Sequence, residues 1–128
     1  MAAVKSKLRQ EAHISQATAK LTGLTTDTSR LWVEATGSYE PGIGRVGFVL
    51  VDLTRDSLSN VIDRKDADYA KPSQEVTDAW TSAVALTSGV PYRVFFHVYD
   101  RSGTNLMAYD RRDFTCTSMP PNRKERAK

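Results

Sequence analysis

Apolar and polar residues alternate most regularly at the end of the stretch 86–99. Its residues fall into two sets, Tyr92, Val94, Phe96 and Val98 on one side and Arg93, Phe95, His97 and Tyr99 on the other. A period of two predicts a β-strand, and its aromatic and β-branched residues favour a place near the centre of a sheet. Gly89 and Pro91, just before the alternation, predict a corner in the chain.

Similar patterns predict several more strands. The expected strands cover residues 13–24, 30–36, 46–53, 76–86 and 106–116, and a short edge strand begins at 61–62. Within 30–36, one face carries Leu31, Val33 and Ala35. Within 76–86, alternation places six side chains on one face: Val76, Asp78, Trp80, Ser82, Val84 and Leu86. The almost wholly apolar run 46–53 predicts a strand that is covered on both faces.

Turn-forming residues separate these strands. We expect a turn at 25–28, a hairpin turn at 101–105, a glycine-rich loop at 37–44 and a charged loop at 63–73. About seven strands without a convincing long helix predict an all-β fold, an antiparallel β-sandwich of two sheets. Parallel α/β folds are excluded because no helical crossovers are available to them.

The length and the charge distribution predict one domain with two basic arms. A chain of 128 residues fits one core, which we place at 13–116, between an arm at 1–12 and a tail at 117–128. The first ten residues and the tail each carry a net charge of +3, so the part between them carries −3 of the overall +3. Cys116, the only cysteine, excludes an internal disulfide and is expected to be a small residue that is buried or half-buried. No signal peptide or membrane-spanning stretch is recognisable, which predicts that the protein is made in the cytoplasm, that of the host if the protein is viral.

One stretch resembles a known structural motif. Leu86-Thr87-Ser88-Gly89-Val90-Pro91-Tyr92 is similar to the tyrosine corner of fibronectin type III and related immunoglobulin-like domains. The resemblance implies an immunoglobulin-like sandwich over 13–116, in which Tyr92 bonds to upstream backbone and Leu86 is its buried partner.

The segment Ser29-Arg30-Leu31-Trp32-Val33 also resembles the second strand of such domains, where a tryptophan packs in the core. Trp32, however, is out of step with Leu31 and Val33. Either Trp32 is the core residue and the face with Leu31 and Val33 points outward, or Trp32 covers the outside of the sheet.

Motifs for small-ligand chemistry are weak. Residues 42–47 match G-x-G-x-x-G, but a β-run follows where a phosphate-binding helix would be needed, so we expect a loop. Asp63, Asp66 and Asp68 lie close together among basic residues and without EF-hand spacing, which favours a solvated loop over a weak cation site.

The two histidines, His13 and His97, lack metal-ligand spacing, and we expect His97 to be a hydrogen-bonded structural residue. There is no G-x-S-x-G motif and no recognisable pair of catalytic acids. The sequence therefore predicts a non-enzymatic protein without metal or cofactor.

Several aromatic residues are candidates for a face that binds sugar or protein, or that covers the second sheet. They are Trp32, Tyr39, Tyr69, Trp80, Phe95 and Tyr99. The basic arms have no interleaved aromatic residues, so we expect neither specific nucleic-acid binding nor membrane insertion.

Two hypotheses for the function follow. Small immunoglobulin-like proteins that decorate phage capsids or tails resemble this description, so the first is a virion component that binds capsid or tail subunits, or sister copies, through its arms. The arm residues expected to make these contacts are Lys5, Lys7, Arg9, Arg123, Lys124 and Arg126. The alternative is an adhesion module that binds carbohydrate or another surface ligand. In that case replacing Trp32 or Trp80 is expected to abolish glycan binding.

Overall fold

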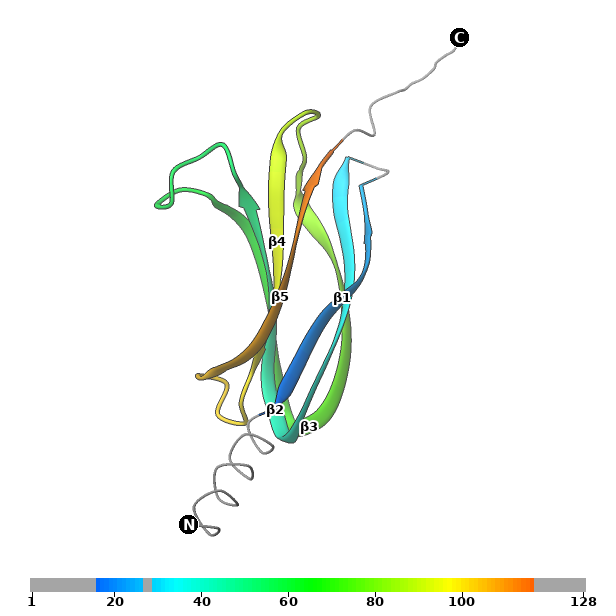
Figure 1. The fold of residues 1–128 in the computed structure, drawn as a ribbon, viewed down its shortest axis with the longest axis vertical. Helices are drawn as coiled ribbons and strands as arrows, with labels where there is room; N and C mark the ends of the chain where they lie inside the picture. Colours follow the sequence, from blue (N-terminus) through cyan, green and yellow to red (C-terminus); the bar gives the residue numbers. More distant parts are fainter. Residues whose placement is uncertain (1–15, 27–28, 117–128) are drawn as a thin grey trace, which may run out of the picture.

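The computed structural model describes residues 16–26 and 29–116 (Figure 1). These residues form five strands, β1 (Ala17–Thr25), β2 (Arg30–Asp52), β3 (Val61–Ala85), β4 (Pro91–Tyr99) and β5 (Leu106–Thr115). All strand pairs are antiparallel. In the described part of the chain no helix is long and apolar enough to cross a membrane.

The two long strands give the sheet its curl. The first part of β2 lies between β1 and the last part of β3, and the second part of β2 lies between the first part of β3 and β4. The change of partners coincides with a register shift between Ser38 and Ile43. β5 then pairs with the free side of β4, and the curled sheet brings β5 next to β1 (Figure 1).

The core fills the inside of this curl. Alternate residues of β2 and β4 point inward, as the period of a strand requires. The fully buried side chains include Leu31, Val33, Val46, Phe48, Leu50, Val94, Phe96 and Val98. The rings of Phe48 and Phe96 lie 5.0 Å apart between centroids, and Trp80 stacks on Phe48 at 5.9 Å. Cys116 is fully buried, as predicted.

The described residues form five strands, whereas the sequence predicts about seven. Two segments predicted as loops are strand, and each of them joins two predicted strands into one. Residues 37–44 continue β2, and residues 63–73 belong to β3. Gly42 and Pro72 stand where these strands bend and change partners, and the bends do not end the strands. The charges of 63–68 also hide an alternation, because Asp66 and Asp68 are exposed whereas Ala67 packs against the core.

Other expectations agree with the structure. β4 and β5 occupy the predicted stretches, joined by the predicted hairpin turn. β1 begins at Ala17, and the first residues of the strand expected at 13–24 lie outside the described residues. Leu31, Val33 and Ala35 point inward, so Trp32 covers the outside of the sheet, where its ring lies over Gly23.

Charged side chains close both sides of the curled sheet. On one side, the Asp110 carboxylate of β5 accepts a hydrogen bond from the Leu21 amide of β1 (2.8 Å), and Arg112 donates to the Leu21 carbonyl (3.2 Å). On the other side, Asp63 accepts from the Ala83 amide (2.7 Å), which links the two parts of β3. Open strand edges invite pairing with other chains, and these contacts occupy them.

The corner before β4 has the geometry that the resemblance implies. The hydroxyl of Tyr92 accepts a hydrogen bond from the Thr87 amide at 2.7 Å. Tyr92 and Leu86 are both buried. Gly89 has a φ of 86°, a conformation that suits glycine, and its amide donates to the Cys116 carbonyl at 3.0 Å.

We expect Tyr92→Phe to lower the free energy of unfolding by about 1–2 kcal/mol, because it leaves the part-buried Thr87 amide without an acceptor. Urea denaturation measures this as a shift of the midpoint. Tyr109→Phe is the matched control, since the Tyr109 side chain is 56% exposed. Equal midpoints for the two variants would contradict the structural role of the Tyr92 hydroxyl.

Candidate functional site

Three aromatic side chains of β4 share its outer side. Phe95, His97 and Tyr99 point outward because Val94, Phe96 and Val98, which alternate with them, fill the core. The rings of Phe95 and His97 are stacked at 5.5 Å, and His97 meets Tyr99 edge-on at 6.1 Å. The strand therefore presents a continuous row of rings outside the core.

β5 adds a fourth ring to this row. The register places Tyr109 directly opposite His97, with ring centroids 6.3 Å from both His97 and Phe95. Tyr109 is also one of the most exposed large apolar side chains in the described residues, at 56%. The cluster thus spans two strands and is open to solvent at its β5 side.

β2 and β3 supply charges beside the rings. The Arg45 guanidinium lies 3.9 Å from the centroid of the Tyr99 ring, a cation–π contact, and is 3.6 Å from an Asp66 carboxylate oxygen. Arg64 is 3.5 Å from the other oxygen of Asp66. We call Arg45, Phe95, His97, Tyr99 and Tyr109 the aromatic face, which Arg64 and Asp66 border.

Gly47 lies between Asp66 and His97 and adds no side chain to this surface. It pairs with Asp66 on one side and with His97 on the other. A Cβ atom at this position would lie 2.6 Å from an Asp66 carboxylate oxygen. Because Gly47 has no side chain, the carboxylate of Asp66 can lean over β2 toward the rings.

His97 is half-buried, and its pKa is lowered. Burial is the main cause, the nearby charges of Arg64 and Arg45 lower it further, and Asp66 acts in the opposite direction. The imidazole is therefore mainly neutral near pH 7, where it offers one donor and one acceptor nitrogen.

The polar atoms of the rings are available for a ligand. No described protein group hydrogen-bonds to the His97 ring, so the hydrogen bond expected for a structural histidine is not found there. Within the same described ranges the hydroxyls of Tyr99 and Tyr109 have no protein partner either. These rings combine apolar surface with unused donors and acceptors.

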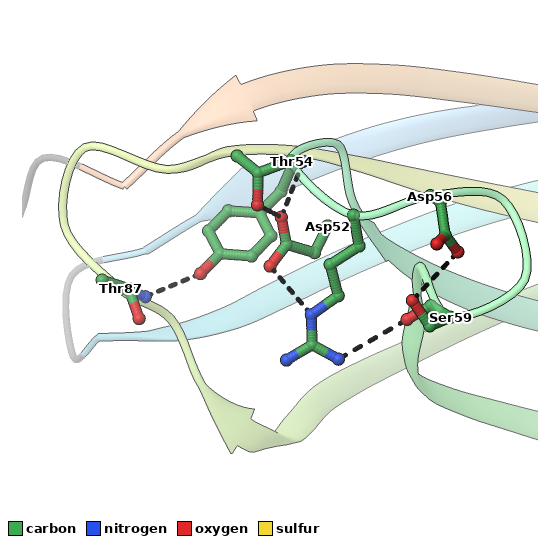
Figure 2. A network of polar contacts seen from close by, with 7 residues as sticks. Asp52, Thr54, Asp56, Ser59 and Thr87 are labelled. Carbon is green, nitrogen blue, oxygen red and sulfur yellow. Dashed lines mark hydrogen bonds and ion pairs between the residues drawn. The ribbon is translucent and has the colours of Figure 1, made fainter.

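A second polar network lies at the C-terminal end of β2, around Asp52 (Figure 2). The Asp52 carboxylate accepts hydrogen bonds from the Thr54 hydroxyl at 2.6 Å and the Thr54 amide at 2.9 Å, and both bonds lower the pKa of Asp52. Arg55 lies 3.5 Å from Asp52 and donates to the Ser59 carbonyl at 3.5 Å. The network fixes the loop between β2 and β3.

Two adjoining hollows lie over β1, the first part of β2 and the part of β3 that pairs with it. Their volumes are about 260 and 250 Å³, and Ser38 and Glu75 line both. Several of their polar groups already bond to one another, such as the hydroxyls of Thr18 and Ser38 at 2.6 Å. Gln74 likewise donates to the Glu40 carbonyl. Tyr39 is the one aromatic residue in their lining, so these hollows lack the adjoining rings of the aromatic face.

The structure separates the predicted candidates. It brings Phe95 and Tyr99 together, whereas Tyr39, Tyr69 and Trp80 pack against the core, and Trp32 lies apart over β1. Leu86, Gly89 and Tyr92 form the corner described above. His13 and the arm residues Lys5, Lys7, Arg9, Arg123, Lys124 and Arg126 lie outside the described residues.

The stretches considered for small ligands are both strand. Residues 42–47 lie within β2 and are followed by more strand, and the 63–68 carboxylates lie along β3. Asp63 bonds to backbone amides and Asp66 pairs with arginines. In the described ranges no group of three or more metal-ligating side chains could hold an ion.

Two residues of the aromatic face, Arg45 and Tyr109, were not predicted from the sequence. The hairpin turn at 101–105 would have placed Tyr109 opposite His97, because a short turn fixes the register of the strands on either side. Nothing local could have placed Arg45 beside Tyr99, since that contact depends on the pairing of β2 with β4.

Comparisons with known proteins show a shared fold and no family. No protein-family model matches the sequence, and no curated protein matches it. Among solved structures, the chain is similar to part of OgpA from Akkermansia muciniphila, with a TM-score of 0.54, 7% identity, and coverage of 76% of this chain and 28% of that one. It is equally similar to part of a β-glucuronidase from Bacteroides uniformis, with a TM-score of 0.54, 8% identity, and coverage of 78% and 13%. The chain thus spans less than a third of either protein.

Proposed function

We propose that this chain is a non-enzymatic binding module that recognises carbohydrate through the aromatic face. The observation that carries the proposal is the cluster of Phe95, His97, Tyr99 and Tyr109, whose rings adjoin one another outside the core. A cluster of rings that lies outside the core and is bordered by charged groups is typical of a recognition surface.

The chemistry of the face matches that of a sugar. A pyranose ring has an apolar surface of C–H groups and a rim of hydroxyls. Phe95 and Tyr109 can cover the C–H groups, while the His97 nitrogens and the tyrosine hydroxyls can exchange hydrogen bonds with the rim. Arg45 and Asp66 add a donor and an acceptor at the edge.

We assign binding to the face, without catalysis. The Asp66 carboxylate that borders the face is already engaged in ion pairs with Arg45 and Arg64. The likeness to a small part of a β-glucuronidase comes with only 8% sequence identity. At such low identity this likeness supports the fold, and the face itself supports the function.

The test is a glycan microarray, with the ligands found then titrated by calorimetry. We expect Phe95→Ala and Tyr109→Ala each to weaken binding at least tenfold, which corresponds to about 1.4 kcal/mol, because each removes a ring from the contact. Trp32→Ala is the matched control, since it removes a half-buried ring elsewhere on the outside of the sheet. It is expected to leave affinity unchanged. This differs from the sequence-based expectation for Trp32, because the structure places that ring away from the cluster.

Two outcomes would contradict the proposal. One is a wild-type protein that binds no glycan on the array. The other is a ligand whose affinity survives both substitutions on the aromatic face. Circular dichroism of each variant distinguishes loss of a contact from loss of the fold.

Attachment to a phage-like particle through the basic arms stays a separate prediction, as does a location in the virion. It rests on the charge of residues 1–10 and 117–128. The two roles are compatible, since the arms and the aromatic face are different parts of the chain.

A further inference from the structure

The loop between β2 and β3 exposes an unusual amount of apolar surface. Residues 53–60 project from the end of the molecule that carries the Tyr92 corner (Figure 1). Leu58 is 97% exposed, and Val61 and Leu53 at the base of the loop are 49% and 36% exposed. Together these three side chains place apolar surface on one loop, and exposed apolar patches mark sites of association.

The loop holds Leu58 in place. One oxygen of Asp56 accepts hydrogen bonds from the Leu58 amide at 3.1 Å and from the Ser59 hydroxyl at 3.2 Å. Arg55 ties the two sides of the loop together through Asp52 and the Ser59 carbonyl (Figure 2). These contacts order the backbone that carries Leu58, and a loop that is already ordered loses less entropy when it binds.

A hollow opens at the base of the same loop. Its volume is about 380 Å³. Val61, Ile62, Val84 and Ala85 form the apolar part of its lining, and Asp52, Arg55, Thr87 and Tyr92 form the rest. A cavity of about 150 Å³ admits a benzene ring, so this hollow has room for a leucine side chain. Arg55 lines it beside its ion-pair partner Asp52, and the Arg55 side chain is still 55% exposed.

We propose that two copies of this chain associate through this end, with Leu58 of each copy seated in the hollow of the other. A two-fold contact requires a surface that is complementary to itself, and here the projecting side chain and the hollow belong to one surface. The charges also match, because Asp56 stands two residues before Leu58 and would approach Arg55 of the second copy.

This inference is independent of carbohydrate binding. The aromatic face lies toward the other end of β4, next to the 101–105 turn, and would stay accessible in the dimer. Two faces held together would raise the avidity for a repeated ligand without any new contact.

Light scattering after size exclusion, on the full chain under reducing conditions, tests the proposal. We expect the wild type to have twice the mass of one chain and Leu58→Asp to have the mass of one chain. Ala85→Trp, which fills the hollow and leaves Leu58 intact, is expected to give the same single mass. Leu106→Asp is the matched control, because Leu106 is 49% exposed at the opposite end and is expected to leave the dimer intact.

Three results would overturn the proposal. The first is a wild type that stays a monomer up to about 1 mM, since a contact weaker than that has no specific role. The second is a dimer that survives Leu58→Asp or Ala85→Trp. The third is a full chain that is monomeric while a chain ending at Cys116 dimerises, which would mean that the C-terminal segment occupies the hollow. Thermal melting of each variant confirms that it is folded.

Discussion

Replacing Phe48 by alanine is expected to destabilise the protein by about 3–5 kcal/mol. Phe48 is fully buried in β2 and contacts two other rings, with centroid distances of 5.0 Å to Phe96 and 5.9 Å to Trp80. Phe96 comes from β4, and Trp80 comes from the last part of β3. The substitution therefore leaves a cavity at the place where distant parts of the curled sheet meet.

Urea denaturation monitored by circular dichroism measures this loss. Phe95→Ala is a matched control, because Phe95 is the same residue type on the outer side of β4, where its ring adjoins His97 and Tyr109. We expect it to cost about 1 kcal/mol. If both substitutions lowered the free energy of unfolding equally, the assignment of Phe48 to the inside and Phe95 to the outside would be contradicted.

The facing of individual strands could be predicted because it is a local property. Alternation along β4 places Val94 inside and Phe95 outside whatever β4 pairs with. In β2 alternation separates Val33 from Trp32, but the sequence left open which of the two faces the core, and the structure places Val33 there. The corner at Tyr92 was also recognisable, because its leucine, glycine and tyrosine lie within seven consecutive residues.

Strand ends were harder to predict, because glycine and proline permit two outcomes. At Gly42 and Pro72 the chain bends and exchanges partners, yet the strands continue through both positions. Sequence patterns mark a departure from regular strand geometry and do not show whether pairing resumes beyond it. Two predicted loops were therefore wrong, and the strand count was too high.

The aromatic face was predictable only in part, for a related reason. Phe95 and Tyr99 follow from alternation within β4. Arg45 joins them through the pairing of β2 with β4, two strands that are separated in sequence by the whole of β3. Non-local pairing of this kind depends on how the entire sheet packs, which a single sequence does not encode in any short motif.

Replacing Gly44 by alanine is expected to cost about 3 kcal/mol or more, because it forces backbone apart. A Cβ atom at Gly44 would lie 2.3 Å from the Arg101 carbonyl oxygen and 2.7 Å from that of Asp100. The Gly44 amide also donates to the Asp100 carbonyl at 2.9 Å. The turn at 101–105 would have to move away from β2.

The same movement should reach the aromatic face. Arg45, which covers the Tyr99 ring, donates to the Gly103 carbonyl at 2.9 Å within this turn. Gly44→Ala is therefore expected to lower both the urea midpoint and the affinity for a glycan that the wild type binds. Gly89→Ala is the control, since a Cβ atom at Gly89 would meet no other atom within 4 Å, although the φ of 86° is unfavourable for alanine. It should lose about 1–2 kcal/mol from backbone strain alone and keep its ligand affinity. A Gly44→Ala protein as stable as the wild type would show that the turn does not press against β2 at this point.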